Sequence, residues 1–98
     1  MALEFEWDPA KAALNLKDHG VSFDEATSVF RDPLSITIAD PDHSYAEDRF
    51  VDLGMSHRGR LLVVSYTERG DAIRIISARD ATRAEQKSYE ETNKKNRL

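Results

Sequence analysis

The hydrophobic period of this chain changes from helical to strand-like at Asp32-Pro33, and this change constrains the fold more than any other feature. In the two segments directly before it, apolar residues recur at helical spacing. After it, apolar and polar residues alternate as they do in half-buried strands. Helices followed by consecutive strands with short turns are typical of an antiparallel β-sheet with helices packed on one face. The sequence therefore predicts an α+β domain of this kind.

The elements before Asp32-Pro33 have recognisable starts and ends. Asp8 suits a helix N-cap, and Gly20 suits the left-handed residue that follows a helix. Ser22 and Glu25 have the spacing of a capping box, which opens a second helix that the proline ends. The predicted elements are a strand over residues 3–7, a helix over 9–19 and a helix over 23–31.

The remainder of the chain is predicted to form strands joined by tight turns, and then one more helix. The sequences His57-Arg58-Gly59 and Arg69-Gly70-Asp71 are short turn signals. Asp80 or Thr82 is the N-cap of the last helix, and Glu85 is placed to complete a capping box. The predicted elements are strands over residues 34–38, 49–55, 60–67 and 72–78, and a helix over 81–92.

The size and composition of the chain limit what it can do. With 98 residues it can bury one core, which argues against a large cofactor-binding enzyme. We expect one domain over residues 1–92, a frayed tail over 93–98 and no cofactor. No apolar run approaches the roughly 18 residues of a membrane span, and the acidic start is unlike a signal peptide. These features predict a cytoplasmic protein that does not bind membranes.

The residue patterns of common metal and nucleophile sites are missing from the sequence. The chain has no cysteine, so thiolate sites are excluded. Asp40, Asp42 and His43 cluster without the spacing of a calcium loop, and the histidines form no helical zinc pair. There is no glycine-rich phosphate loop and no Gly-x-Ser-x-Gly turn. The sequence therefore predicts no metal site.

Metal-free cleavage of RNA is a chemistry that the remaining polar residues can support. It needs a base for the 2′-hydroxyl, cations for the charge that develops at phosphorus, and an acid for the leaving 5′-oxygen. The candidate proton-transfer residues are Glu47, His19 and His57. The candidate phosphate-binding residues are Arg49, Arg69, Arg74 and Arg79. Strand alternation predicts that Arg74 and Arg79 face opposite sides of the sheet, so a shared site does not follow.

Structural explanations compete with each of these assignments. Glu47 and Arg49 have the spacing of a surface ion pair on one strand face. His19 suits the C-terminal end of a helix, where a cation complements the dipole. The chain has 14 Lys and Arg against 18 Asp and Glu, so its arginines are also explained as part of a solvated, salt-bridged surface.

Many separated segments of the chain also follow the pattern of a known family. They are Phe5-Glu6-Trp7-Asp8, Lys11, Asn15, His19-Gly20-Val21-Ser22-Phe23, Glu47-Asp48-Arg49, Leu53-Gly54, the run from Leu62 to Arg69, Arg74-Ile75-Ile76-Ser77-Ala78-Arg79, Glu85 and Tyr89. In order and spacing, the chain resembles the BrnT family of small toxins over nearly the whole predicted domain.

The resemblance implies a ribonuclease toxin of a type II toxin–antitoxin pair, with a fold similar to that of the RelE-type toxins. It implies a BrnA-like ribbon-helix-helix antitoxin as partner, RNA as substrate, and contact with operator DNA only through the antitoxin. On this reading the catalytic residues are Glu47, His19, Arg49, Arg74 and Arg79, and the RNA-binding residues are Arg69, Tyr66, Lys11 and His57. Tyr66 has two alternatives: it stacks on a base, or it belongs to the core.

Three positions depart from the family pattern. Asp18 stands where a lysine precedes the His-Gly pair, Asp80 replaces a basic residue after Arg79, and Ala46 replaces a glycine. Each change makes the anion site less positive or less flexible. The alternative function is therefore a weak or inactive toxin-like module that acts only in a repressor complex with its antitoxin.

Overall fold

The computed structural model describes residues 3–39 and 49–95, and it contains every predicted element with ends within three residues of those expected. The predicted second helix divides into an α-helix and a 3₁₀ turn. The elements are β1 (Glu4–Glu6), α1 (Pro9–His19), α2 (Phe23–Thr27), η1 (Ser28–Arg31), β2 (Ile36–Ala39), β3 (Arg49–Met55), β4 (Leu61–Arg69), β5 (Ala72–Asp80) and α3 (Arg83–Lys95).

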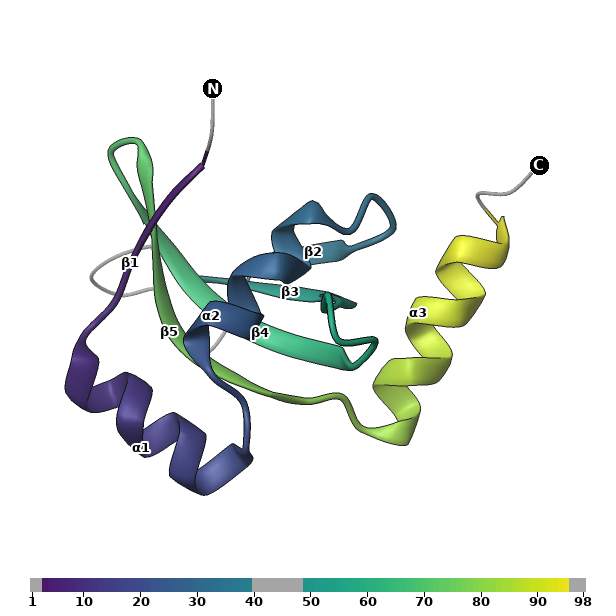
Figure 1. Ribbon diagram of the computed structural model, residues 1–98. Helices are drawn as coiled ribbons and strands as arrows, with labels where there is room; N and C mark the ends of the chain where they lie inside the picture. The colour runs from purple at the N-terminus through teal and green to yellow at the C-terminus, as the bar shows by residue number, and fades with distance from the viewer. Residues whose placement is uncertain (1–2, 40–48, 96–98) are drawn as a thin grey trace.

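The five strands form one sheet in the order β1-β5-β4-β3-β2. All neighbours are antiparallel except β1 and β5, which run parallel at one edge. Helices α1 and α2 and the turn η1 cover one face, and α3 stands apart from them at the right of Figure 1. The core between the helices and the sheet is formed by Val21, Phe23, Ala26, Val29, Leu62, Val64, Tyr66, Ile73, Ile75 and Ala78.

A β-bulge in β5 decides which side chains share a face of the sheet. Tyr66 pairs with Ile75, whereas the preceding Ser65 pairs with Ser77, so Ile76 is an extra residue on β5. An extra residue reverses the alternation of all side chains beyond it. The prediction that Arg74 and Arg79 face opposite sides is therefore wrong, because simple alternation ignored this bulge.

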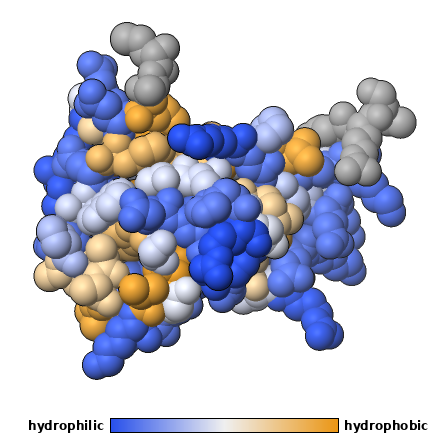
Figure 2. All heavy atoms as spheres, in the orientation of Figure 1, coloured by the Kyte–Doolittle hydropathy of each residue, from blue (hydrophilic) through white to orange (hydrophobic). Residues whose placement is uncertain are grey.

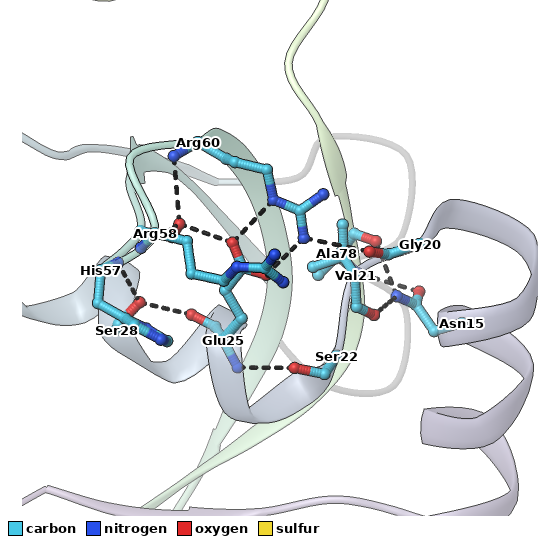
Figure 3. A network of polar contacts seen from close by, with 11 residues as sticks. Asn15, Gly20, Val21, Ser22, Glu25, Ser28, His57, Arg58, Arg60 and Ala78 are labelled. Atoms are coloured by element: carbon cyan, nitrogen blue, oxygen red, sulfur yellow. Dashed lines mark hydrogen bonds and ion pairs between the residues drawn. The ribbon is translucent and has the colours of Figure 1, made fainter.

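Asn15 of α1 closes the part of β5 that β1 does not reach. The β1 pairing ends at Arg74, and within residues 3–39 and 49–95 no strand pairs with the outer edge of β5 beyond that residue. The buried Asn15 amide donates to the carbonyls of Ala78, at 2.8 Å, and Val21, at 2.9 Å, and its oxygen accepts from the Ala78 N–H at 3.1 Å. Figure 3 shows these three residues together. One side chain thus fixes α1 to the sheet and satisfies an otherwise open strand edge.

We expect Asn15→Leu to destabilise the protein by about 2–4 kcal/mol, because it keeps the side-chain volume but leaves buried backbone groups unpaired. Urea unfolding followed by circular dichroism measures this loss. Leu16→Ala is the control, since Leu16 lies on the same helix and is 52% exposed. A loss no larger than that of the control would contradict this role for Asn15.

Glu25 connects α2 to the turn between β3 and β4. Only half of the predicted capping box forms: the Ser22 hydroxyl accepts from the Glu25 N–H at 3.0 Å, but the carboxylate turns inward. It accepts from the Arg60 guanidinium and from the Ser56 hydroxyl, at 2.7 Å from the latter. Arg58 lies beside this pair in Figure 3. The Glu25 side chain, whose spacing from Ser22 predicted a helix cap, therefore forms a tertiary contact instead.

Helix α3 is attached to the body by polar contacts. The Tyr89 hydroxyl donates to Asp32 at 2.6 Å, and the Asn93 amide donates to the Leu34 carbonyl at 3.2 Å. The helix continues through Lys95, so residues 93–95, expected in the tail, are helical here. No helix in residues 3–39 or 49–95 is long and apolar enough to cross a membrane.

The covered side of the molecule leaves some apolar surface exposed. Leu14 and Leu16 of α1 are each more than half exposed. Figure 2 shows apolar surface at the lower left, where α1 lies in Figure 1.

Candidate functional site

The sheet face opposite α1 and α2 carries all four arginines that the sequence marked as phosphate-binding candidates. We call it the open face. The registers and the bulge place on it Glu6 of β1, Arg74, Ser77 and Arg79 of β5, Val63, Ser65, Thr67 and Arg69 of β4, Arg49, Val51 and Leu53 of β3, and Ile36 and Ile38 of β2. Its apolar side, next to α3, borders a groove of about 270 Å³ that Glu85 and Ser88 also line.

Arg49 and Arg74 lie in one row across the sheet. Both pair with Thr67, which lies between them on the central strand. Neighbouring strands are about 4.8 Å apart, so the two arginine backbones are about 10 Å apart. Arg74 also donates to the Glu6 carboxylate at 2.7 Å, and both side chains are only partly buried. This end of the open face therefore presents a pair of arginines with one carboxylate at its edge.

Arg79 lies two cross-strand rows away and is held by Glu85 of α3. Its two terminal nitrogens donate to the two Glu85 oxygens at 2.8 and 3.0 Å. This pairing raises the pKa of Arg79 and, together with the helix cap, lowers the pKa of Glu85 to about 2. Both groups are charged at neutral pH, so Arg79 is a fixed cation that donates hydrogen bonds but does not act as a general acid.

The other predicted site residues are divided among different parts of the molecule. His19 and Lys11 line a shallow hollow of about 170 Å³ beside the bulge residue Ile76. His57 lies on the turn between β3 and β4, exposed and close to Ser28 rather than to the open face. Glu47 lies outside the described residues. The structure therefore brings the arginines together on the open face, whereas His19 and Lys11 lie on α1 and His57 lies on a turn.

Tyr66 belongs to the core, which was one of its two alternatives. Its ring is 7% exposed, contacts Phe30 edge-on at 4.9 Å and stacks on Phe50 at 5.7 Å. Its hydroxyl donates to Asp52 at 3.0 Å. Burial raises the pKa values of both Tyr66 and Asp52. A ring enclosed in this way has no face for a nucleobase, so Tyr66 is not an RNA-stacking residue.

Two carboxylates of the open face were missed as arginine partners. Glu6 lies on the polar side of an alternating strand, but its partner Arg74 is 68 residues away and nothing local indicates the pairing. Glu85 was assigned to a capping box, which does form, and it also binds Arg79. The part of the chain that the structure describes contains no group of three potential metal ligands.

Comparison with known proteins supplies the class of protein. The family model "Ribonuclease toxin, BrnT, of type II toxin-antitoxin system" matches residues 7–85. A 1.1 Å crystal structure of the Brucella abortus ribonuclease toxin BrnT is similar, with a TM-score of 0.62 and 21% identity over 84% of this chain and 100% of that one. At that identity the likeness shows the fold alone. No curated protein matches this chain.

The fold and the matched family model define a ribonuclease toxin of the type II toxin–antitoxin class. The chain belongs to the BrnT family. The family resemblance and the α+β fold class read from the sequence are both confirmed.

Proposed function

We propose that the open face binds RNA and that the chain cleaves it without a metal ion. The observation that carries this proposal is the β5 bulge, which brings Arg79 to the same face of the sheet as Arg74 of β5 and Arg49 of β3. Planar guanidinium groups suit bidentate contacts with phosphate oxygens. Arg49 and Arg74 in one cross-strand row, with Arg79 further along the same face, can therefore contact different phosphates of one RNA strand.

The chemistry that these arginines support is attack by the 2′-hydroxyl on its neighbouring phosphorus. The transition state carries more negative charge than the substrate, and fixed cations stabilise it more strongly than they stabilise bound RNA. Proton transfer is assigned to Glu47 and His19, with the order of base and acid left open. Lys11 shares the hollow of His19 and is suited to a further phosphate. Arg69, at the end of β4, extends the binding face.

We further propose a BrnA-like ribbon-helix-helix antitoxin as the partner that neutralises this activity in the cytoplasm. Operator DNA would be reached only through that antitoxin. This assignment is supported by the family model, which places the chain in a type II system.

The test is cleavage of naked RNA by the purified chain in the presence of EDTA. We expect cleavage to survive chelation, and Arg74→Ala to reduce it by about tenfold to a hundredfold, because one phosphate contact is lost. Arg31→Ala is the matched control, since Arg31 is exposed at the end of η1, on the helix-covered side. Cleavage that disappears in EDTA, or equal loss in both variants, would overturn the proposal.

A second candidate function is a binding module that acts only in a repressor complex. It is favoured by the carboxylates Glu6 and Glu85, which already neutralise two of the arginines, and by the net charge of −4. On this reading, expression without an antitoxin is harmless to cells and the purified chain leaves RNA intact. Growth arrest on expression, together with cleavage in vitro, would exclude it.

A further inference from the structure

The Arg79 guanidinium has five N–H groups, and its described contacts use three of them. One Nη1 proton is directed to Glu85 at 2.8 Å and the other to the Asp80 carbonyl at 3.2 Å. Nη2 gives one proton to Glu85 at 3.0 Å. The Nε proton and the second Nη2 proton have no acceptor within residues 3–39 and 49–95. These two protons lie on the same edge of the planar group.

Glu85 is itself held by contacts that do not involve Arg79. Its Oε1 atom accepts from the Thr82 N–H at 2.9 Å, and its own N–H donates to the Thr82 hydroxyl at 3.2 Å. This reciprocal capping box starts α3. Further along, Tyr89 attaches the same helix to Asp32. The carboxylate is therefore fixed by the helix, and it in turn determines the orientation of the guanidinium.

We propose that Glu85 is a positioning residue that holds Arg79 so that its Nε–Nη2 edge is left for a phosphate of RNA bound to the open face. Two parallel N–H groups match two oxygens of one phosphate. A cation held in advance loses little freedom when the transition state forms, which makes it more effective there. This inference rests on the proposed ribonuclease function and adds a role for the start of α3.

The same contact has an opposite interpretation, in which Glu85 competes with the phosphate for Arg79. The two interpretations predict opposite changes in cleavage when Glu85 is removed. If Glu85 positions Arg79, its removal lowers cleavage. If Glu85 competes with RNA, its removal frees the cation and raises cleavage.

The experiment measures kcat and KM for a short fluorogenic RNA with the full chain. For Glu85→Ala we expect kcat to fall about tenfold to thirtyfold with KM changed less than threefold, because the arginine is displaced rather than removed. Thr82→Ala removes only the hydroxyl that accepts from the Glu85 N–H; the backbone N–H of residue 82 still donates to the Glu85 carboxylate, and the Glu85–Arg79 pair remains, so cleavage should be retained within about twofold. The kcat of Glu85→Gln should lie between those of Glu85→Ala and Thr82→Ala, because the amide oxygen still accepts from Arg79 and preserves the cap.

A double-mutant cycle separates positioning from a general structural effect. In the Arg79→Ala background, Glu85→Ala should cause no further loss of kcat. Additive losses, equal losses in Glu85→Ala and Thr82→Ala, or faster cleavage by Glu85→Ala would each overturn the inference. The wild-type chain and Arg79→Ala report separately on the proposed function. If wild-type RNA cleavage is present and depends on Arg79 while Glu85→Ala matches wild type, only the positioning role fails.

Discussion

Arg79→Ala is expected to lower RNA cleavage by at least about a hundredfold and to restore growth to cells that express the chain without antitoxin. Arg79 is a cation held on the open face. Under the proposed mechanism, its loss removes stabilisation of the charge that increases in the transition state. The ion pair with Glu85 is partly exposed, at 43% and 32% for the two side chains. Its loss should therefore cost about 1 kcal/mol of stability or less, and the protein should remain folded.

Three measurements on the purified variant check this expectation. Single-turnover cleavage gives the catalytic loss, thermal unfolding gives the stability, and binding to the antitoxin shows that the surface is otherwise intact. Arg79→Lys keeps the charge but loses the planar pair of donors, so it should recover only part of the activity. Unchanged toxicity of Arg79→Ala would remove this residue from the catalytic machinery.

The fold could be predicted from the sequence because its elements are specified locally. Asp8 and Gly20 cap α1 as expected, with Gly20 at a positive φ of 70°. The alternation after Asp32-Pro33 gave the strands, and short turns gave their antiparallel order. Tertiary contacts between distant residues have no such local signal. The Asn15 contact with Ala78 spans 63 residues, and no spacing rule indicates it.

The arrangement of the candidate arginines could not be predicted from the sequence, and the bulge at Ile76 explains why. Strand alternation correctly orients side chains until a residue is inserted, and every later residue then changes face. Arg74 and Arg79 are five positions apart, which predicts opposite faces by alternation, yet both lie on the open face. Between the two arginines the sequence is Ile75-Ile76-Ser77-Ala78, with no glycine or proline, so nothing in it marks the extra residue.

Glu25→Ala is expected to destabilise the fold by about 3 kcal/mol at neutral pH. Glu25 is 2% exposed and accepts from both Arg60 and Ser56. Removing it leaves the Arg60 guanidinium with the Gly20 carbonyl, at 3.1 Å, as its remaining acceptor among the described residues. Arg60 is 31% exposed, so water partly replaces the carboxylate and keeps the loss near the lower end for such pairs.

The same contact predicts a pH dependence with a definite sign. The Arg60 hydrogen bond lowers the pKa of Glu25 from 4.5 to about 2, so the folded state favours the ionised carboxylate. Its contribution is complete above about pH 5 and is lost as the pH falls through 2. Glu25→Gln should therefore show a shallower loss of stability between these values than wild type, in urea unfolding at a series of pH values. The stability of Glu25→Gln should still fall somewhat with pH, because the pKa of Glu85 is also about 2. Glu91→Gln, at an exposed position of α3, is the control and should retain the wild-type slope. If the stability of Glu25→Gln falls with pH as steeply as that of this control, the Glu25–Arg60 contact does not control acid stability.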